Sequence, residues 1–244
     1  MKYLNHDEIT AICNNINAKH IPNEHSFEQK LDELFEFNQL NSSEFLRHSF
    51  KELLKNVDSE IKVIEEKVDI SATCQIGCAH CCYFPIITTA LETSLIVNEI
   101  SKLPDEKKAN IIEHLRHYFN VNEQKIQNLC SIDFEEHNDF KYQYIAAQLP
   151  CPLLDTTTNT CLAYEVRPIP CRTYLNYSHP NVCKDSFMPK EPFSYEFLHG
   201  YYMDSLNEIL EAVIYEEDLD IQLEYPNDLF RIDYLPLLLR EKLR

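Results

Sequence analysis

Apolar side chains recur at every third or fourth position along much of this chain, which is the spacing of one face of an amphipathic helix. The pattern predicts a helix from Ser26 to about Leu40 and a longer helix from Ser43 to about Val68. We interpret both helices as packing scaffold. The apolar positions that define them are Phe27, Leu31, Leu34 and Phe35, and then Leu46, Phe50, Leu53, Leu54, Val57, Ile61, Ile64 and Val68.

Helix start signals recur further along the chain. Thr89 followed three residues later by Glu92 has the spacing of a capping box, so a helix is expected to begin there. Pro104, followed by acidic residues, predicts the first turn of another helix, which reaches about Leu129. Three more helices are predicted from Ser131 to Leu149, from Phe193 to Glu217 and from Asp228 to Leu239.

Between residues 150 and 192 the pattern predicts little regular structure. Pro168 and Pro170 exclude a helix interior, because proline lacks the backbone N-H that a helix needs. The turn-forming residues from Asp155 to Thr160 are typical of a small hairpin.

Composition favours helices over sheets. Only Gly77 and Gly200 are glycine and there is no tryptophan, whereas Leu, Ile, Glu and Lys fill long segments. We predict an all-α protein that forms a single domain over residues 1–244. Within it we expect a cysteine-cluster core at about 70–190, a helical N-terminal extension at 1–70 and a helical C-terminal part at 193–244.

Charge and hydropathy narrow the classes of partner. The chain has 22 Lys plus Arg against 40 Asp plus Glu, a net charge of −18, and such a surface repels phosphate backbones. We therefore expect no nucleic-acid partner. The first ten residues lack the apolar segment of a secretory signal, and no apolar run approaches the roughly 18 residues that span a bilayer. We expect a cytoplasmic protein without a membrane partner, and the sequence leaves any protein partner open.

Eight of the ten cysteines fall into two groups, one in the segment C-Q-I-G-C-A-H-C-C at 74–82 and one between 151 and 183. Clustered thiols in a reducing compartment are more typical of metal sites than of disulfides. Soft thiolates bind zinc, iron or iron-sulfur clusters, and eight of them can hold two metals. We assign Cys13 and Cys130 to packing. The predicted metal ligands are Cys74, Cys78, Cys81, Cys82, Cys151, Cys161, Cys171 and Cys183.

Neighbouring residues project in different directions, so Cys81 and Cys82 are expected to bind two metals, or to divide into one ligand and one supporting group. Gly77 predicts a tight, left-handed turn before Cys78. Eight thiolates around two divalent ions would leave about four negative charges, so either fewer cysteines bind at once or cations compensate them. Arg167 and Arg172, on either side of Cys171, are candidates to donate hydrogen bonds to the sulfurs.

The four segments C-Q-I-G-C-A-H-C-C, C-P-L-L-D, C-L-A-Y-E-V-R-P and C-R-T-Y resemble the YkgJ-type cysteine-cluster proteins, also called the CxxCxxCC family of zinc- or iron-chelating domains. The resemblance spans about 74 to 183, and three residues rather than two separate its first pair of cysteines. It implies that the first seven of the eight cysteines form the cluster, with Cys183 as the eighth. It also makes Glu92, Arg167 and Arg172 candidates to support the ligands around the bound cofactor.

The favoured function is therefore a cytoplasmic metal-binding protein that holds one or two zinc or iron ions in a multi-cysteine cluster. The alternative is an iron-sulfur, S-adenosylmethionine-dependent enzyme that modifies proteins, because Cys74, Cys78 and Cys81 have the spacing of radical enzymes of that class and some relatives resemble lysine N-methylases. A third interpretation is a catalytic metal site with Glu92 or Asp155 as acid or base. Whether the protein is an enzyme stays open.

Overall fold

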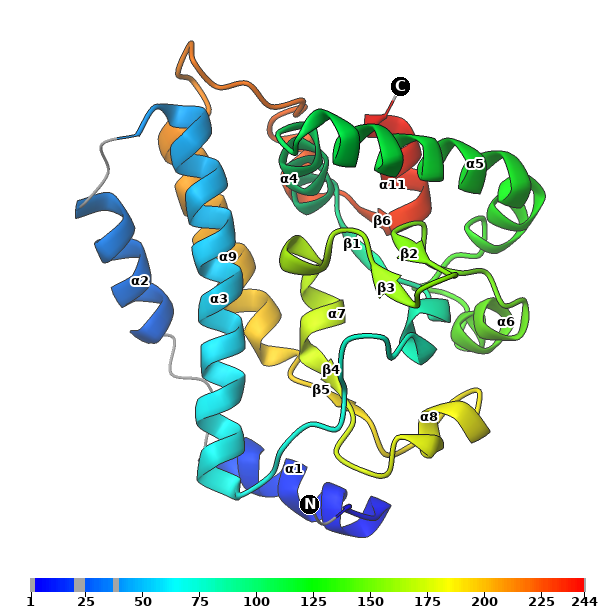
Figure 1. The fold of residues 1–244 in the computed structure, drawn as a ribbon. Coiled ribbons are helices and arrows are strands. Elements are labelled where there is room, and N and C mark those ends of the chain that lie inside the picture. Colours follow the sequence, from blue (N-terminus) through cyan, green and yellow to red (C-terminus); the bar gives the residue numbers. More distant parts are fainter. Residues whose placement is uncertain (1–2, 20–24, 37–39, 244) are drawn as a thin grey trace. The chain divides into compact units, whose positions relative to one another are not determined.

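The computed structural model describes residues 3–19, 25–36 and 40–243, and it is mostly helical with a few short strands (Figure 1). The chain forms two compact units, each built from separate stretches of sequence. Unit 1 comprises Met1–Cys74, Ile169–Val182 and Pro189–Ile221, and unit 2 comprises Gln75–Pro168, Cys183–Met188 and Gln222–Arg244. The expected single domain stays a prediction.

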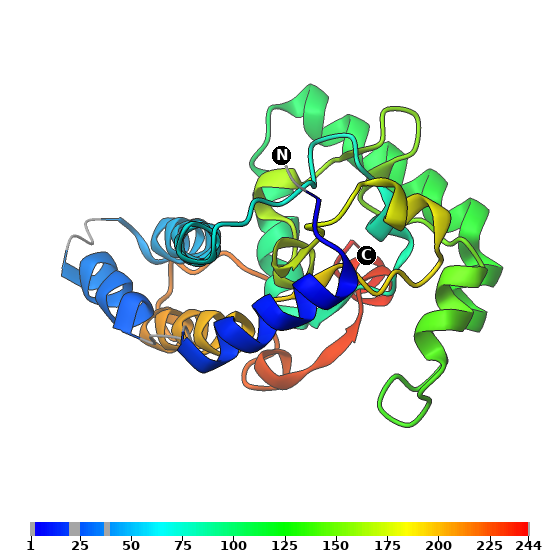
Figure 2. The same ribbon diagram turned by 90° about the horizontal axis from the view of Figure 1, so that it is seen from below.

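Unit 1 is built on two long helices, α3 (Ser42–Val68) and α9 (Phe197–Val213), which pack against each other and against α2 (His25–Glu36). Figures 1 and 2 show these three helices side by side. The predicted apolar face of α3 is confirmed, since Phe50, Leu53 and Leu54 are fully buried. The other elements of unit 1 are α1 (His6–Lys19), α7 (Ile169–Thr173), β4 (Tyr174–Leu175) and β5 (Phe193–Ser194), and β4 pairs antiparallel with β5.

Unit 2 is built on three helices, α4 (Ala90–Ser101), α5 (Asp105–Leu129) and α11 (Leu235–Lys242), which pack against one another (Figure 1). The antiparallel pair β1 (Ile87–Thr89) and β6 (Ile232–Tyr234) joins α4 to α11. The remaining elements are the 3-10 turns η1 (His80–Tyr83) and η2 (Tyr164–Val166), α6 (Phe140–Ala146), the hairpin β2 (Leu154–Asp155) and β3 (Thr160–Cys161), and α10 (Asn227–Phe230). The helix α8 (Asn181–Asp185) crosses from unit 1 into unit 2.

An aromatic core cluster in unit 2 joins α5, α6 and β6. Tyr144 stacks on Tyr234 with their ring centroids 5.9 Å apart, and the buried Cys130 lies among the same side chains. Burial raises the pKa of the Cys130 thiol to about 12, so it stays protonated. The prediction that Cys130 serves packing is confirmed.

Several expected elements differ in the structure. The helix predicted over 131–149 is wrong, since only α6 is helical and the residues before it form turns. The region 228–239 is two short helices separated by β6, not one helix. The helix predicted from Phe193 begins at Phe197, because residues 193–194 form β5. The helix α1 was not anticipated, and the strands show that the all-α prediction holds only as a mostly helical fold.

The cysteine-rich segment is more regular than predicted. The hairpin at 154–161 is confirmed, but α7 and α8 are short helices within a region expected to be irregular. Pro170 is the second residue of α7. A helix tolerates proline there because the N-H groups of its first turn have no hydrogen-bond acceptor within the helix, so none is lost. Along the chain as described, none of the helices combines the length and the apolar character needed to cross a membrane.

The predicted start of α4 at Thr89 is confirmed, with the Thr89 side chain as its N-cap. The Thr89 hydroxyl accepts a hydrogen bond from the Glu92 N-H at 3.1 Å. The Glu92 carboxylate is fully buried and accepts a hydrogen bond from the Thr88 hydroxyl. Thr89 therefore caps the helix, while Glu92 anchors the end of β1.

Replacing Thr89 with alanine is expected to lower the free energy of unfolding by about 1 kcal/mol, because an N-terminal N-H of α4 loses its acceptor. Chemical denaturation measures this change. The matched control is Ser59→Ala, where an exposed hydroxyl bonds only to the Lys55 carbonyl of its own helix. The control should stay within about 0.5 kcal/mol of the wild type, and equal effects of the two variants would contradict the cap.

Candidate metal centre

The first cysteine group opens with a tight turn. Gly77 has a φ of +92°, in the left-handed region that glycine adopts at little cost, and the Cys78 N-H donates to the Gln75 carbonyl at 3.0 Å. The predicted turn at Gly77 is confirmed. It delivers the chain to η1, which carries Cys81 and Cys82.

Cys81 and Cys82 interact directly through their side chains. Their hydrogen bond raises the pKa of the Cys81 thiol well above its usual value, and burial and the negative charge of Cys82 act in the same direction. Whether the two sulfurs bind different metals, or divide into one ligand and one supporting group, stays a prediction.

The second cysteine group is joined to the first inside unit 2. The Cys151 N-H donates to the Cys82 carbonyl at 2.7 Å, and the Leu153 N-H donates to the Cys151 sulfur at 3.4 Å. Cys151 is buried. The backbone thus holds two thiol-bearing segments against each other, although they are far apart in the sequence.

The β2–β3 hairpin places Cys161 opposite Leu154. Asp155 shapes its turn, since the carboxylate accepts from the Thr158 hydroxyl at 2.7 Å and the Thr157 N-H at 2.9 Å. These hydrogen bonds lower the pKa of Asp155, which is half-buried. The observed contacts of Asp155 are those of a turn residue, and they give no support to its use as an acid or base.

Arg167 packs against Tyr164 and acts on Cys81 through its charge. Its guanidinium stacks on the Tyr164 ring at 4.3 Å from the centroid and donates to the Tyr164 carbonyl at 3.3 Å. Its positive charge lowers the pKa of Cys81, against the larger effects of Cys82 and burial. The charge of Arg167 thus opposes part of the negative charge on Cys81, and a hydrogen bond from Arg167 to a sulfur stays a prediction.

Unit 1 holds the other two cysteines of the predicted set. Cys74 is exposed, and its sulfur accepts a hydrogen bond from the Asn176 N-H at 3.4 Å. Cys171 lies in α7, which Arg172 fastens to α3 through an ion pair with Asp58. Arg172 is buried in this ion pair, so a hydrogen bond from it to a sulfur stays a prediction.

A histidine also holds α7. The His199 Nε2 atom lies 2.8 Å from the Thr173 hydroxyl oxygen, two residues after Cys171. Burial lowers the pKa of His199, while the charge of Glu196 acts more weakly in the opposite direction. The histidine is therefore neutral in the folded protein at neutral pH.

Stability is expected to fall when the pH drops below about 6.5, the ordinary pKa of histidine in an unfolded chain. Below this pH the unfolded chain takes up a proton on His199, whereas the folded protein does so only at a lower pH. The stability that neutral His199 contributes is therefore complete above the unfolded pKa, and it is lost as the pH falls through the lowered pKa of the folded protein. Denaturant unfolding at several pH values should show a smaller loss in His199→Gln. The exposed His48→Gln is the control, and a slope equal to that of the wild type in both variants would contradict the prediction.

Two further predicted residues lie in unit 2. Cys183 is half-buried in α8 and lines a small cavity together with His80. Glu92 is buried against Thr88 at the start of α4, so its support of the ligands stays a prediction.

The structure records all ten cysteines, which lie in its described ranges, as thiols rather than disulfides. Among the described residues, no three His, Cys, Asp or Glu side chains lie close enough together to hold a metal ion. The full eight-cysteine site therefore stays a prediction. The donor chemistry within unit 2 nevertheless fits a soft metal, since the neighbouring thiols of Cys81 and Cys82 are the kind of ligand that zinc and iron prefer.

Comparison of the chain with known protein families gives a match over the segment that carries both cysteine groups. Residues 73–192 match the CxxCxxCC family model. Its description is "Putative zinc- or iron-chelating domain", and the match confirms the resemblance over a segment that contains all eight clustered cysteines. No curated protein and no solved structure matches the chain. We refer to residues 73–192 as the CxxCxxCC segment.

Sequence reasoning missed the residues that fasten this segment in place. Asp58 pairs with Arg172 from 114 residues away, and Asn176 donates to Cys74 from 102 residues away. No local pattern connects such partners. The one available signal was that α3 carries an acidic residue, Asp58, next to its apolar face.

Proposed function

We propose that the CxxCxxCC segment binds zinc or iron through the thiolates of its two cysteine groups. The observation that carries the proposal is the backbone hydrogen bond between Cys151 and Cys82, because it holds the two groups together without a metal. The family description supports the same metals. The proposed ligands are Cys74, Cys78, Cys81, Cys82, Cys151, Cys161, Cys171 and Cys183, in a cytoplasmic protein.

A bound cation would supply the positive charge that lets neighbouring thiols ionise together. Cys81 and Cys82 are the first candidates, because in the protein alone the charge on one sulfur opposes the charge on the other. Arg167 would offset part of the remaining negative charge, and Glu92 and Arg172 would hold the adjoining elements in place. The metal has a structural or a storage role in this proposal, and no reaction is assigned to it.

Elemental analysis combined with native mass spectrometry tests the proposal. Protein purified under reducing conditions, without reconstitution, is expected to carry about one or two zinc or iron ions per chain. The absorption spectrum separates the metals, because zinc thiolates are colourless in the visible range and iron thiolates are coloured. Purified protein that contains neither metal would rule the proposal out.

The second candidate is an iron-sulfur enzyme that uses S-adenosylmethionine to modify proteins. The spacing of Cys74, Cys78 and Cys81 favours it. The sheets of the described residues are two-stranded and antiparallel, which differs from the parallel barrel that such enzymes use, so we rank it second. Anaerobically purified protein that is colourless and does not bind S-adenosylmethionine would exclude it.

A further inference from the structure

Two side chains of α5 hold the backbone carbonyl groups on either side of Cys151. The His114 Nε2 atom lies 2.9 Å from the Pro152 carbonyl oxygen, and the Tyr118 hydroxyl donates to the Pro150 carbonyl at 2.8 Å. Because a carbonyl oxygen only accepts, Nε2 carries the hydrogen and the imidazole is the donor. His114 and Tyr118 are four residues apart, so they lie on the same face of α5. Together they fix the backbone immediately before and after Cys151.

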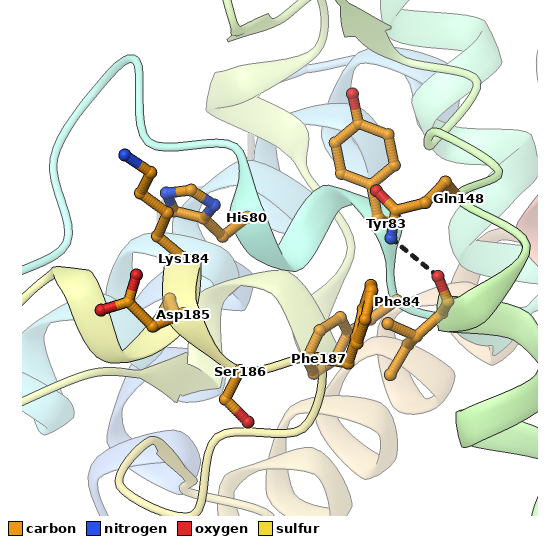
Figure 3. Close-up of a pocket in the computed structure, with 10 residues that line it drawn as sticks. His80, Tyr83, Phe84, Gln148, Lys184, Asp185, Ser186 and Phe187 are labelled. Carbon is orange, nitrogen blue, oxygen red and sulfur yellow. Dashed lines mark hydrogen bonds between the residues drawn. The ribbon is translucent and has the colours of Figure 1, made fainter.

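The backbone that leads into Cys151 is fixed as well. Gln148 has a φ of +50°, in the left-handed region, so the chain turns sharply after the end of α6. Its side-chain N-H donates to the Ile145 carbonyl at 2.7 Å, and Figure 3 shows this hydrogen bond. Further along α5, the Lys125 ammonium donates to the Ala147 carbonyl at 3.2 Å. The path of the chain from α6 to the cysteine is therefore defined by hydrogen bonds.

The Cys151 residue itself is held at two further atoms. Its N-H donates to the Cys82 carbonyl at 2.7 Å, and its sulfur accepts from the Leu153 N-H at 3.4 Å. Cys151 and Tyr118 are both buried. Hydrogen bonds to the groups around a metal ligand orient that ligand, and the sulfur of Cys151 has such bonds on its own residue and on both neighbours.

A second tyrosine of unit 2 makes the same kind of bond away from the cysteines. The Tyr234 hydroxyl donates to the Ile132 carbonyl at 2.9 Å, and Tyr234 and Tyr118 belong to the same buried core cluster. The bond of Tyr234 serves packing. The bond of Tyr118 differs from it in one respect, which is that its acceptor adjoins a proposed metal ligand.

We propose that Tyr118 and His114 are positioning residues, which hold the Cys151 thiol where it binds zinc or iron. This inference rests on the metal-binding function proposed above. Both side chains touch the backbone and act on the metal through Cys151. A ligand that is held in place before the metal arrives loses less conformational freedom on binding, so the two bonds raise the affinity for the metal.

Competition with a coloured chelator measures the affinity of the full chain for Zn²⁺ or Fe²⁺, according to which ion the purified wild type carries. Tyr118→Phe is expected to weaken binding about tenfold, which is the lower end of the effect of groups that support a ligand. His114→Leu should weaken binding as well, and His114→Gln should restore most of the affinity because it keeps an N-H donor. Tyr234→Phe is the matched control and should bind as the wild type does.

Alkylation of the metal-free protein by iodoacetamide, followed at each cysteine by mass spectrometry, gives a readout that needs no metal. Tyr118→Phe should raise the alkylation rate of Cys151 about fivefold, the equivalent of one hydrogen bond. The rate at Cys130, which is buried in the same core cluster, should stay at its wild-type value. General loosening of the core would instead raise both rates together, and that result would contradict a positioning role.

Equal metal affinities of Tyr118→Phe and Tyr234→Phe, in a wild type that binds metal, would overturn this inference alone. A wild type that binds neither ion would overturn the proposed function and this inference with it, so the two failures are distinguishable. Circular dichroism verifies that each variant is folded. If Tyr118→Phe does not fold, the comparison of His114→Leu with His114→Gln decides, since His114 is only half-buried.

Discussion

The double substitution Cys81→Ser and Cys82→Ser is expected to remove the bound zinc or iron from the protein. The hydroxyl of serine stays protonated near neutral pH and is a harder donor than a thiolate, so it does not replace sulfur in a soft-metal site. Metal affinity should fall by at least about tenfold, because loss even of groups that only support a ligand costs 10- to 100-fold. Elemental analysis of wild type and variant purified in parallel measures the change.

The control for this experiment is Cys13→Ser, since Cys13 lies in α1 and outside both cysteine groups. Cys130 is unsuitable, because a buried hydroxyl in the aromatic cluster would disturb folding by itself. A double variant that keeps its metal and its circular dichroism spectrum would exclude Cys81 and Cys82 as ligands. Single serine variants of Cys151 and Cys161 would then test the second group.

Replacing Asp228 with alanine is expected to lower the free energy of unfolding by about 3 kcal/mol. The Lys242 ammonium lies 2.7 Å from the Asp228 carboxylate, and their side chains are only 9% and 4% exposed. The same carboxylate accepts from the Glu224 N-H at 3.0 Å. The substitution leaves a buried ammonium without its counter-ion, which is the costly outcome for a buried pair. Urea denaturation with a two-state fit measures the loss.

The control uses Glu241, which lies next to Lys242 in α11. Arg231 and Glu241 form an ion pair at 2.6 Å, but their side chains are 38% and 46% exposed, so Glu241→Ala should cost less than about 1 kcal/mol. The double variant Asp228→Leu, Lys242→Met should recover much of the lost stability, since an apolar pair needs no desolvated charge. Equal costs for Asp228→Ala and Glu241→Ala would contradict the buried-pair explanation.

The long helices were predictable because their signals are local. Asn41 caps α3 through the Glu44 N-H, Thr89 caps α4, and the apolar faces between caps follow the helical period. The same reasoning failed after α5, where the Asp133 carboxylate accepts from the N-H groups of Glu135 and Glu136. An aspartate side chain that accepts hydrogen bonds from the backbone just after it favours a turn over a helix. The spacing of apolar residues carries no information about such bonds, so it predicted a helix.

The strand β6 shows a second limit. Tyr234 is buried and pairs with Ile87, and Ile232 pairs with Thr89. In both pairs the residue of β6 comes more than 140 positions after its partner in β1. Three residues are too few for an alternating pattern to stand out from a helical one. The strand exists because β1 offers it a partner, which is a property of the tertiary structure.

The candidate site, too, was predictable only in part. The positions and the soft character of the cysteines were read directly from their spacing, and the turn at Gly77 followed from the residue itself. The hydrogen bond between the Cys81 and Cys82 thiols was not foreseen, because it depends on side-chain rotamers that the spacing of the cysteines does not fix. The cavity beside η1 was not foreseen either, since Phe84, Gln148 and Phe187 come from three separate segments.

The β2–β3 hairpin bears on the order in which the molecule assembles. It brings Cys161 opposite Leu154 by pairing over a short loop, and such hairpins form in about 1–10 µs because closing a short loop costs little entropy. The chain from Leu154 to Cys161 therefore pairs through local contacts, early and without a metal. An incoming ion would meet this part of the cysteine set already in place, so capture there is expected to be limited by diffusion and deprotonation and not by folding.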